Sequence, residues 1–277
     1  MPTGDRDGSG GEHHGDGANP GSQRDEVWAM SCYCQHLLIG PTPVAEGTRR
    51  VERLLEGWRG TTADHLRGWL GPLNAMEGRF EDARAWIEES RALIRDLGLR
   101  HHEGIQDLLS AYIELLAGDP AAATRELRAA NEVFIEIGDR WYLSTVAVEL
   151  PAAVYAQGRY DDAAALAEAI EDAPAPNDLE WQIKRRAIGA KLLARGGDLD
   201  RAESLGREAV ALVSASDFLG FHGDVLLDLA EVLELADRSA EAATAAEEAV
   251  RLHERKGNVV SAGRARTRAA ELRGAGK

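Results

Sequence analysis

Small and apolar residues recur along this chain with a period of about 40 residues. One series of alanines follows steps of 40, 40, 39 and 40: Ala83, Ala123, Ala163, Ala202 and Ala242. Two further series keep these steps, one beginning twelve residues earlier and one seven residues later: Gly71, Ala111, Pro151, Ala190 and Ala230, then Ser90, Ala130, Ile170, Ala209 and Ala249. Three series in one register predict stacked helical hairpins, each of which buries its apolar face on its neighbours.

The same kind of turn separates the two predicted helices of each repeat. A glycine, or Asp237 in the last repeat, stands five residues before the alanine of the first series. Glycine fits the end of a helix because a left-handed residue there has no Cβ clash. The acidic residues that follow suit the first turn of the second helix, and Asp119 before Pro120 is the clearest cap. The predicted turns are Gly78–Ala83, Gly118–Ala123, Gly158–Ala163, Gly197–Ala202 and Asp237–Ala242.

Four segments follow from this pattern. Residues 1–24 contain almost no apolar side chains and are predicted to be disordered. Residues 25–59 form a degenerate first hairpin, 60–257 hold five clear repeats, and 258–277 form a capping helix and a tail. Pro174 and Pro176 predict a stop and a bend after the third repeat, because proline cannot continue a helix.

The turn glycine, the acidic residues and the spaced small residues resemble the tetratricopeptide repeat. This resemblance implies an all-α fold, a right-handed α-solenoid of about five to six hairpins. The period of 40 departs from the roughly 34 residues of the standard repeat, so HEAT-type repeats remain an alternative. Two strings, 40–46 and 253–262, resemble the C-terminal repeat region of bacterial regulators in which a class III nucleotide cyclase and an AAA-type ATPase precede the repeats.

Composition and charge narrow the classes of partner. The net charge of -15 argues against nucleic acid and anionic membranes. Cys32 and Cys34 are too close to form a good disulfide and too few to hold a metal ion, so we expect reduced thiols. The chain has no apolar stretch of membrane-spanning length and no signal peptide pattern, which predicts a cytoplasmic location.

The polar clusters do not match the spacing of known catalytic or metal sites. His101, His102 and Glu103 lack the spacing of a metalloprotease helix, and at the start of a helix we expect them to face solvent. The glycines of 8–11 lack the lysine of a phosphate loop, and pairs such as Asp161 and Asp162 have a capping role. We therefore expect no enzymatic activity, no metal and no cofactor.

A binding surface is expected on the first helices, which the resemblance places on the concave face. Lys184 and Lys191 are seven residues apart and Arg195 continues their helical face, with Arg186 adjoining. The same mapping brings in Tyr112, Tyr155 and His65. The hypothesis is a groove with a basic end that binds an acidic peptide or a C-terminal carboxylate. Charge reversal at both lysines is then expected to abolish binding without lowering the melting temperature.

Two alternatives stay open for these residues. The basic side chains can instead balance neighbouring acids such as Asp178 and Glu180, and the apolar side chains of Leu108, Leu115 and Leu116 can signal self-association. The predicted function is a non-enzymatic protein-interaction scaffold in bacterial signal transduction or regulation, with a protein or peptide as partner. The alternative is a detached repeat module, or remnant, of a cyclase/AAA-ATPase regulator that acts only with a partner in trans.

Overall fold

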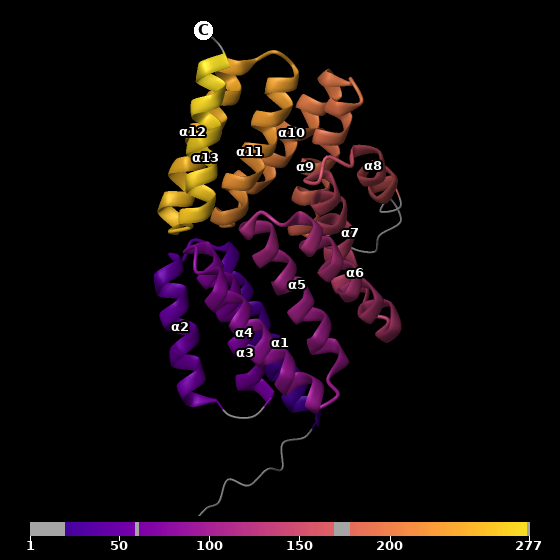
Figure 1. The fold of residues 1–277 in the computed structure, drawn as a ribbon, viewed down its shortest axis with the longest axis vertical. Coiled ribbons are helices and arrows are strands. Elements are labelled where there is room, and N and C mark those ends of the chain that lie inside the picture. Colours follow the sequence, from indigo (N-terminus) through magenta and orange to yellow (C-terminus); the bar gives the residue numbers. More distant parts are fainter. Residues whose placement is uncertain (1–19, 59–60, 169–177, 276–277) are drawn as a thin grey trace, which may run out of the picture.

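The computed structural model describes residues 20–58, 61–168 and 178–275, which form thirteen α-helices and no strand (Figure 1). The prediction of an all-α solenoid is confirmed. The helices are α1 (Pro20–Ile39), α2 (Val44–Gly57), α3 (Thr61–Met76), α4 (Phe80–Asp96), α5 (Arg100–Ala117), α6 (Pro120–Ile137), α7 (Arg140–Tyr155), α8 (Tyr160–Glu168), α9 (Leu179–Arg195), α10 (Leu199–Ser214), α11 (Leu219–Leu235), α12 (Ser239–Lys256) and α13 (Val259–Ala275).

The turns inside the hairpins have the predicted backbone conformation. Gly118 ends α5 with φ of 84°, and Asp237 takes the same left-handed conformation with φ of 57°. Asp119 caps α6, where its carboxylate accepts a hydrogen bond from the backbone N–H of Ala122 at 2.8 Å. The other left-handed glycines of the hairpin turns are Gly78, Gly158 and Gly197, and those that follow second helices are Gly98, Gly138 and Gly257.

The small residues of the three series lie where helices approach most closely. Ala83 is fully buried on α4, opposite Gly71 of α3. A Cβ on Gly71 would lie only 3.0 Å from the carbonyl oxygen of Ala83. A larger side chain at such a contact costs about 1–3 kcal/mol, because the helices would have to separate. The period in the sequence therefore records one helix–helix contact, repeated in each hairpin.

Helix α1 begins at Pro20, so the last residues of the predicted disordered tail (1–24) are helical. Proline is favoured at the first helical position, and the apolar residues that follow anchor the rest of α1 in the core, as Leu37 shows. Residues 1–19 lie outside the described residues, and so do Ile170 and the bend predicted at Pro174 and Pro176.

The stack curves until its last helices contact its first hairpin (Figure 1). The contact is centred on Lys256, the last residue of α12, whose side chain is fully buried. Its ammonium group donates hydrogen bonds to the carbonyl oxygens of Leu37 at 2.7 Å, Gly40 at 2.9 Å and Thr42 at 2.7 Å. These carbonyls belong to the end of α1 and the turn before α2. We call this contact the Lys256 clasp, and it closes the solenoid into a ring.

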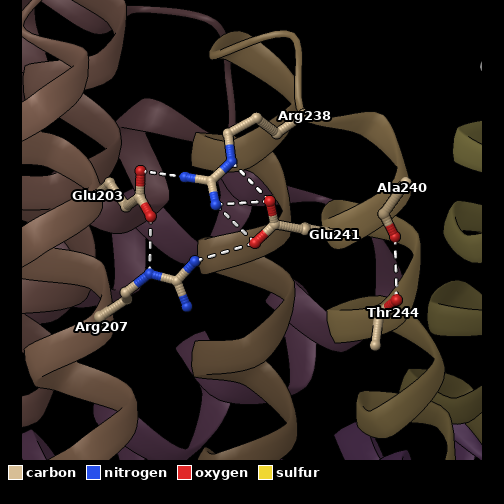
Figure 2. A network of polar contacts seen from close by, with 6 residues as sticks. All are labelled: Glu203, Arg207, Arg238, Ala240, Glu241 and Thr244. Carbon is tan, nitrogen blue, oxygen red and sulfur yellow. Dashed lines mark hydrogen bonds and ion pairs between the residues drawn. The ribbon is translucent and has the colours of Figure 1, made fainter.

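The second helices carry charged networks on the outer side of the ring. Figure 2 shows one between α10 and α12, in which Glu203 and Arg207 meet Arg238 and Glu241. The Nε of Arg207 lies 2.7 Å from Glu203 Oε1, and its Nη2 lies 3.2 Å from Glu241 Oε2. These side chains are largely exposed, so each pair contributes no more than about 1 kcal/mol.

Candidate functional site

The first helices of the hairpins line a cavity inside the ring, in agreement with the expected concave face. Side chains from α1, α3, α5, α7, α9, α11 and α13 contribute to its wall. It has a part of about 100 Å³ next to α1 and a part of about 240 Å³ next to α13. Both walls are mainly apolar, and we call the first the apolar part and the second the polar part because more charged side chains line the second. The two parts are adjacent, since five residues line both of them: Tyr112, Leu115, Glu149, Lys184 and Phe221. We call the whole space the central cavity.

The apolar part combines aliphatic and aromatic side chains from both ends of the chain. Ile39 comes from α1 and Trp69 from α3, and both are buried. Leu108 and Leu115, which the sequence offered as a self-association surface, also face this space. Leu116 is buried and lines the polar part. These leucines lie on the inner face of the ring, and a role for them in self-association stays a prediction.

Lys184 lies between the two parts and is already paired. Its Nζ is 2.8 Å from Glu180 Oε1, forms an ion pair with Glu149, and lies 4.1 Å from the ring centre of Phe221. Burial alone would lower its pKa, but the two carboxylates outweigh burial and raise the pKa of Lys184 above its usual value. The lysine is therefore charged, and its charge is matched within the protein.

Lys191 and Arg195 form a second paired group, about two and three turns further along α9. Lys191 Nζ lies 2.8 Å from Asp228 Oδ1 and 3.2 Å from Glu231 Oε2. Arg195 donates from Nε to the hydroxyl oxygen of Tyr155 at 2.9 Å and lies 2.6 Å from Glu231. The hydroxyl of Tyr155 donates to Glu231 at 2.6 Å. The network is locally balanced in charge.

The groove is therefore not basic, which corrects the hypothesis of a basic end. The reason is that Lys184, Lys191 and Arg195 each reach carboxylates on α7 or α11, or on α9 itself. Of the predicted binding residues, Tyr112, Lys184 and Lys191 line the central cavity, and Tyr155 and Arg195 adjoin Lys191. Arg186 points elsewhere: its Nε lies 3.4 Å from Glu208 on α10. A role for these residues in binding a partner stays a prediction.

His65 is also not a cavity residue, because it is fully buried next to α1. Its Nε2 lies 2.7 Å from the Oγ of Ser31 and accepts from the indole N–H of Trp69 at 3.3 Å. Burial lowers the pKa of His65 to about 3. Its Nδ1 has no hydrogen-bond partner, so the serine–histidine pair lacks the orienting carboxylate of a catalytic triad.

His101 and His102 are half-buried, and this corrects the prediction that they face solvent. His101 Nε2 lies 3.0 Å from Asp139 Oδ2, and the ring of His102 packs edge-on against His65 with centres 5.2 Å apart. The hairpin brings α5 against α3, which covers the helix start that we expected to be open. No group of three or more possible metal ligands occurs among the described residues.

Asp224 of α11 is one of the charged cavity residues that the sequence analysis did not select, together with Glu149, Asp228 and Arg264. It lines the polar part, and 52% of its side chain is exposed there. Burial, together with the nearby carboxylate of Asp228, raises the pKa of Asp224 to about 7. The signal was present in the sequence, since Asp224 and Asp228 are four residues apart on a first helix and so share one face.

Within residues 20–58, 61–168 and 178–275, no helix is long and apolar enough to cross a membrane. Both cysteines are free thiols, as expected: Cys32 is exposed and Cys34 is buried in the core.

Comparisons with known proteins support the fold. No protein-family model matches the chain, and no curated protein matches it significantly in sequence. A structure of NprR in complex with its cognate peptide NprX is similar, with a TM-score of 0.63, 13% identity, and coverage of 87% of this chain and 71% of that one. The apo form of the quorum sensor NprR from B. thuringiensis has a TM-score of 0.51 and 11% identity, and the match covers 83% of this chain and 61% of that one. A Rap protein complexed with Competence and Sporulation Factor has a TM-score of 0.55 and 11% identity, and the match covers 91% of this chain and 73% of that one. At these identities the likeness concerns the fold alone, and that fold is a helical solenoid of tetratricopeptide-like repeats.

Proposed function

We propose that this protein is a non-enzymatic interaction module that binds a peptide segment of a partner in the central cavity. The observation that carries the proposal is the cavity itself, which the first helices of the repeats surround on the inside of a closed ring. Its apolar part suits a hydrophobic side chain, and its polar part offers charged groups for a backbone or a terminus. A segment that spans both parts would use both kinds of contact.

The similar solved structures support this proposal. One was solved in complex with its cognate peptide, and another with Competence and Sporulation Factor. The repeat architecture that they share with this chain is suited to enclosing an extended ligand, because many short helices contribute one or two side chains each. A regulatory setting, such as bacterial signal transduction, follows by analogy with the quorum sensor among them.

The alternative, a detached repeat module of a cyclase/AAA-ATPase regulator, rests on the sequence resemblance alone. The solved structures named above support the tetratricopeptide-like repeats and give no link to a cyclase or an ATPase. A peptide receptor needs no second domain for binding, whereas the alternative requires a cyclase or ATPase as the bound partner. The identity of the captured partner therefore separates the two functions.

The test fills the cavity without changing its charge. Ala152 lies on α7 and lines the polar part, so Ala152→Trp should block it. Ala121→Trp adds the same side chain at an exposed site on α6 and serves as the matched control. Peptides from the native lysate are incubated with each protein, and those retained are identified by mass spectrometry. We expect the wild type and Ala121→Trp to retain the same peptides and Ala152→Trp to lose them. Equal retention by all three proteins would exclude the central cavity as the binding site.

A further inference from the structure

The carboxylates around the central cavity differ in whether a cation already pairs with them. Glu149 pairs with Lys184, and Asp228 pairs with Lys191 at 2.8 Å. Among the residues that the structure describes, Asp224 has no lysine or arginine within ion-pair distance. Its contact is the buried ring of His253, whose Nε2 lies 3.4 Å from Asp224 Oδ1. Burial lowers the pKa of His253 to about 4, so this ring is neutral and supplies no charge.

The other charged groups around Asp224 are held by partners of their own. Arg264 of α13 donates to the carbonyl oxygens of Leu115 at 3.1 Å and Leu116 at 2.7 Å. Lys184 is taken up by its two glutamates. The titratable and charged groups that face Asp224 come from six helices: Tyr112 of α5, Glu149 of α7, Lys184 of α9, Asp228 of α11, His253 of α12 and Arg264 of α13. A carboxylate in this position lacks a compensating cation, although it opens into the cavity.

An ammonium group suits the position beside Asp224 better than a metal ion does. A metal ion needs several ligands in a fixed geometry, and no group of three possible ligands is present in the described parts of the chain. An ammonium group is compact and carries three donors, which suits a carboxylate that has other carboxylates nearby. The polar part of the cavity, about 240 Å³, has room for such a group with a short stretch of peptide.

We propose that Asp224 binds an ammonium group of the peptide, either its free amino terminus or a lysine side chain, inside the central cavity. This inference rests on the proposed function and adds the chemical class of the ligand. It reverses the charge that the sequence analysis expected, because a cationic rather than an acidic end of the peptide enters the polar part.

A pH dependence follows from the same contact. The carboxyl of Asp224 is partly protonated near neutral pH, since its pKa is about 7. An ammonium ligand therefore displaces a proton when it binds at lower pH. The affinity should rise between pH 5 and pH 7 by up to about fivefold in total, because water partly screens the half-exposed carboxyl. For a free amino terminus it should fall again above about pH 8, where the amino group loses its proton.

The experiment uses three pools of short random peptides and the full chain. The first pool has free amino termini and no basic side chains, the second has acetylated termini and no basic side chains, and the third has acetylated termini with one lysine. Each pool is incubated with the protein, and bound peptides are separated by size exclusion and identified by mass spectrometry. The proteins are the wild type, Asp224→Asn, and the control Asp200→Asn, whose carboxylate is exposed on the outer helix α10. Melting curves verify that each variant is folded.

We expect the wild type and the control to retain peptides of the first pool, the third pool or both, which identifies the source of the ammonium group. Asp224→Asn should weaken the binding of these peptides by about tenfold, since it removes the carboxylate that pairs with the ammonium group in the bound state. Retention of the second pool, with an unchanged Asp224→Asn, would overturn this inference and leave the proposed function standing. Retention of no pool by the wild type would count against both.

Discussion

Replacing Lys256 by methionine removes the ammonium group of the Lys256 clasp and keeps a side chain of similar length. Three hydrogen bonds are lost, to the carbonyl oxygens of Leu37, Gly40 and Thr42. Each bond from a charged donor contributes about 1.5–3 kcal/mol, and a buried carbonyl left without a donor costs about 1–3 kcal/mol. Methionine avoids the burial cost of the charge, which is several kcal/mol and offsets part of this loss. We expect a net destabilisation of about 3–5 kcal/mol.

The measurement combines urea unfolding with hydrogen exchange. Unfolding gives the loss of free energy, and exchange locates it. Since the clasp joins segments more than 200 residues apart in sequence, its loss should release the first hairpin and leave the middle of the stack protected. Amides of α1 and α2 should therefore exchange faster than those of α5 and α6. Arg255→Met is the matched control, because Arg255 is exposed on the same turn of α12 and should change the stability by less than about 0.5 kcal/mol.

One result would refute this reasoning. If Lys256→Met lost less than about 1 kcal/mol and the exchange of α1 and α2 were unchanged, the clasp would not be what closes the ring. A uniform rise in exchange along all helices would instead indicate a general loss of packing, and the specific role of the contact would be rejected.

Three further predictions concern the helices around the cavity. Gly223→Ala should destabilise the protein by about 1–3 kcal/mol, because the new Cβ would lie 2.5 Å from Nε2 of His253. In the control Gly263→Ala, the new Cβ meets no atom within 4 Å, so this variant should stabilise α13 by up to about 1 kcal/mol. Thermal unfolding of the two variants tests both expectations. Lys184→Glu should lower the free energy of unfolding by about 3–5 kcal/mol, and with it the melting temperature, because it places a carboxylate beside two others. An unchanged melting temperature would support the expectation from the sequence that charge reversal at Lys184 leaves the fold intact. The raised pKa of Asp224, about 7, favours the protonated form in the folded state, so stability is lost as pH rises from about 4 to 7. Asp224→Asn should therefore raise the free energy of unfolding, relative to the wild type, more at pH 8 than at pH 5. The difference should be less than about 1 kcal/mol because the carboxyl is half exposed, and an equal effect at both pH values would contradict the raised pKa of Asp224.

The sequence was sufficient for the repeats because the signals of a hairpin are local. A turn glycine such as Gly118, a cap such as Asp119 and a small residue such as Ala123 lie within six residues of one another and act on the same turn. Asp237 kept the turn without a glycine, and the period alone was enough to identify it. The start of α1 at Pro20 was missed because composition gives no measure of how far a packed helix extends past its apolar residues.

The site depended on contacts between hairpins, and these the sequence did not reveal. Lys184 and Lys191 were found because they share one helical face, but their partners Glu149 and Asp228 lie on neighbouring hairpins, 35 and 37 residues away. Arg186 was grouped with them by nearness in sequence, and the helix turns it toward α10 instead. Pairing decides whether a charge is available to a ligand, so the sequence could name cations without giving the charge of the groove.

By itself, the sequence determined that this chain is an all-α stack of 40-residue hairpins, and the resemblance to the tetratricopeptide repeat placed the first helices on the inner face. Periodicity and turn residues are local properties of a repeat, and the same signals recur in each of the repeats. The tertiary structure alone decided that the stack closes through Lys256 and that, among the described residues, no lysine or arginine lies within ion-pair distance of Asp224. Both depend on the curvature summed over all the hairpins, which brings together residues such as Lys256 and Leu37, 219 positions apart. A small rotation at each interface sets that sum, and no local pattern encodes it.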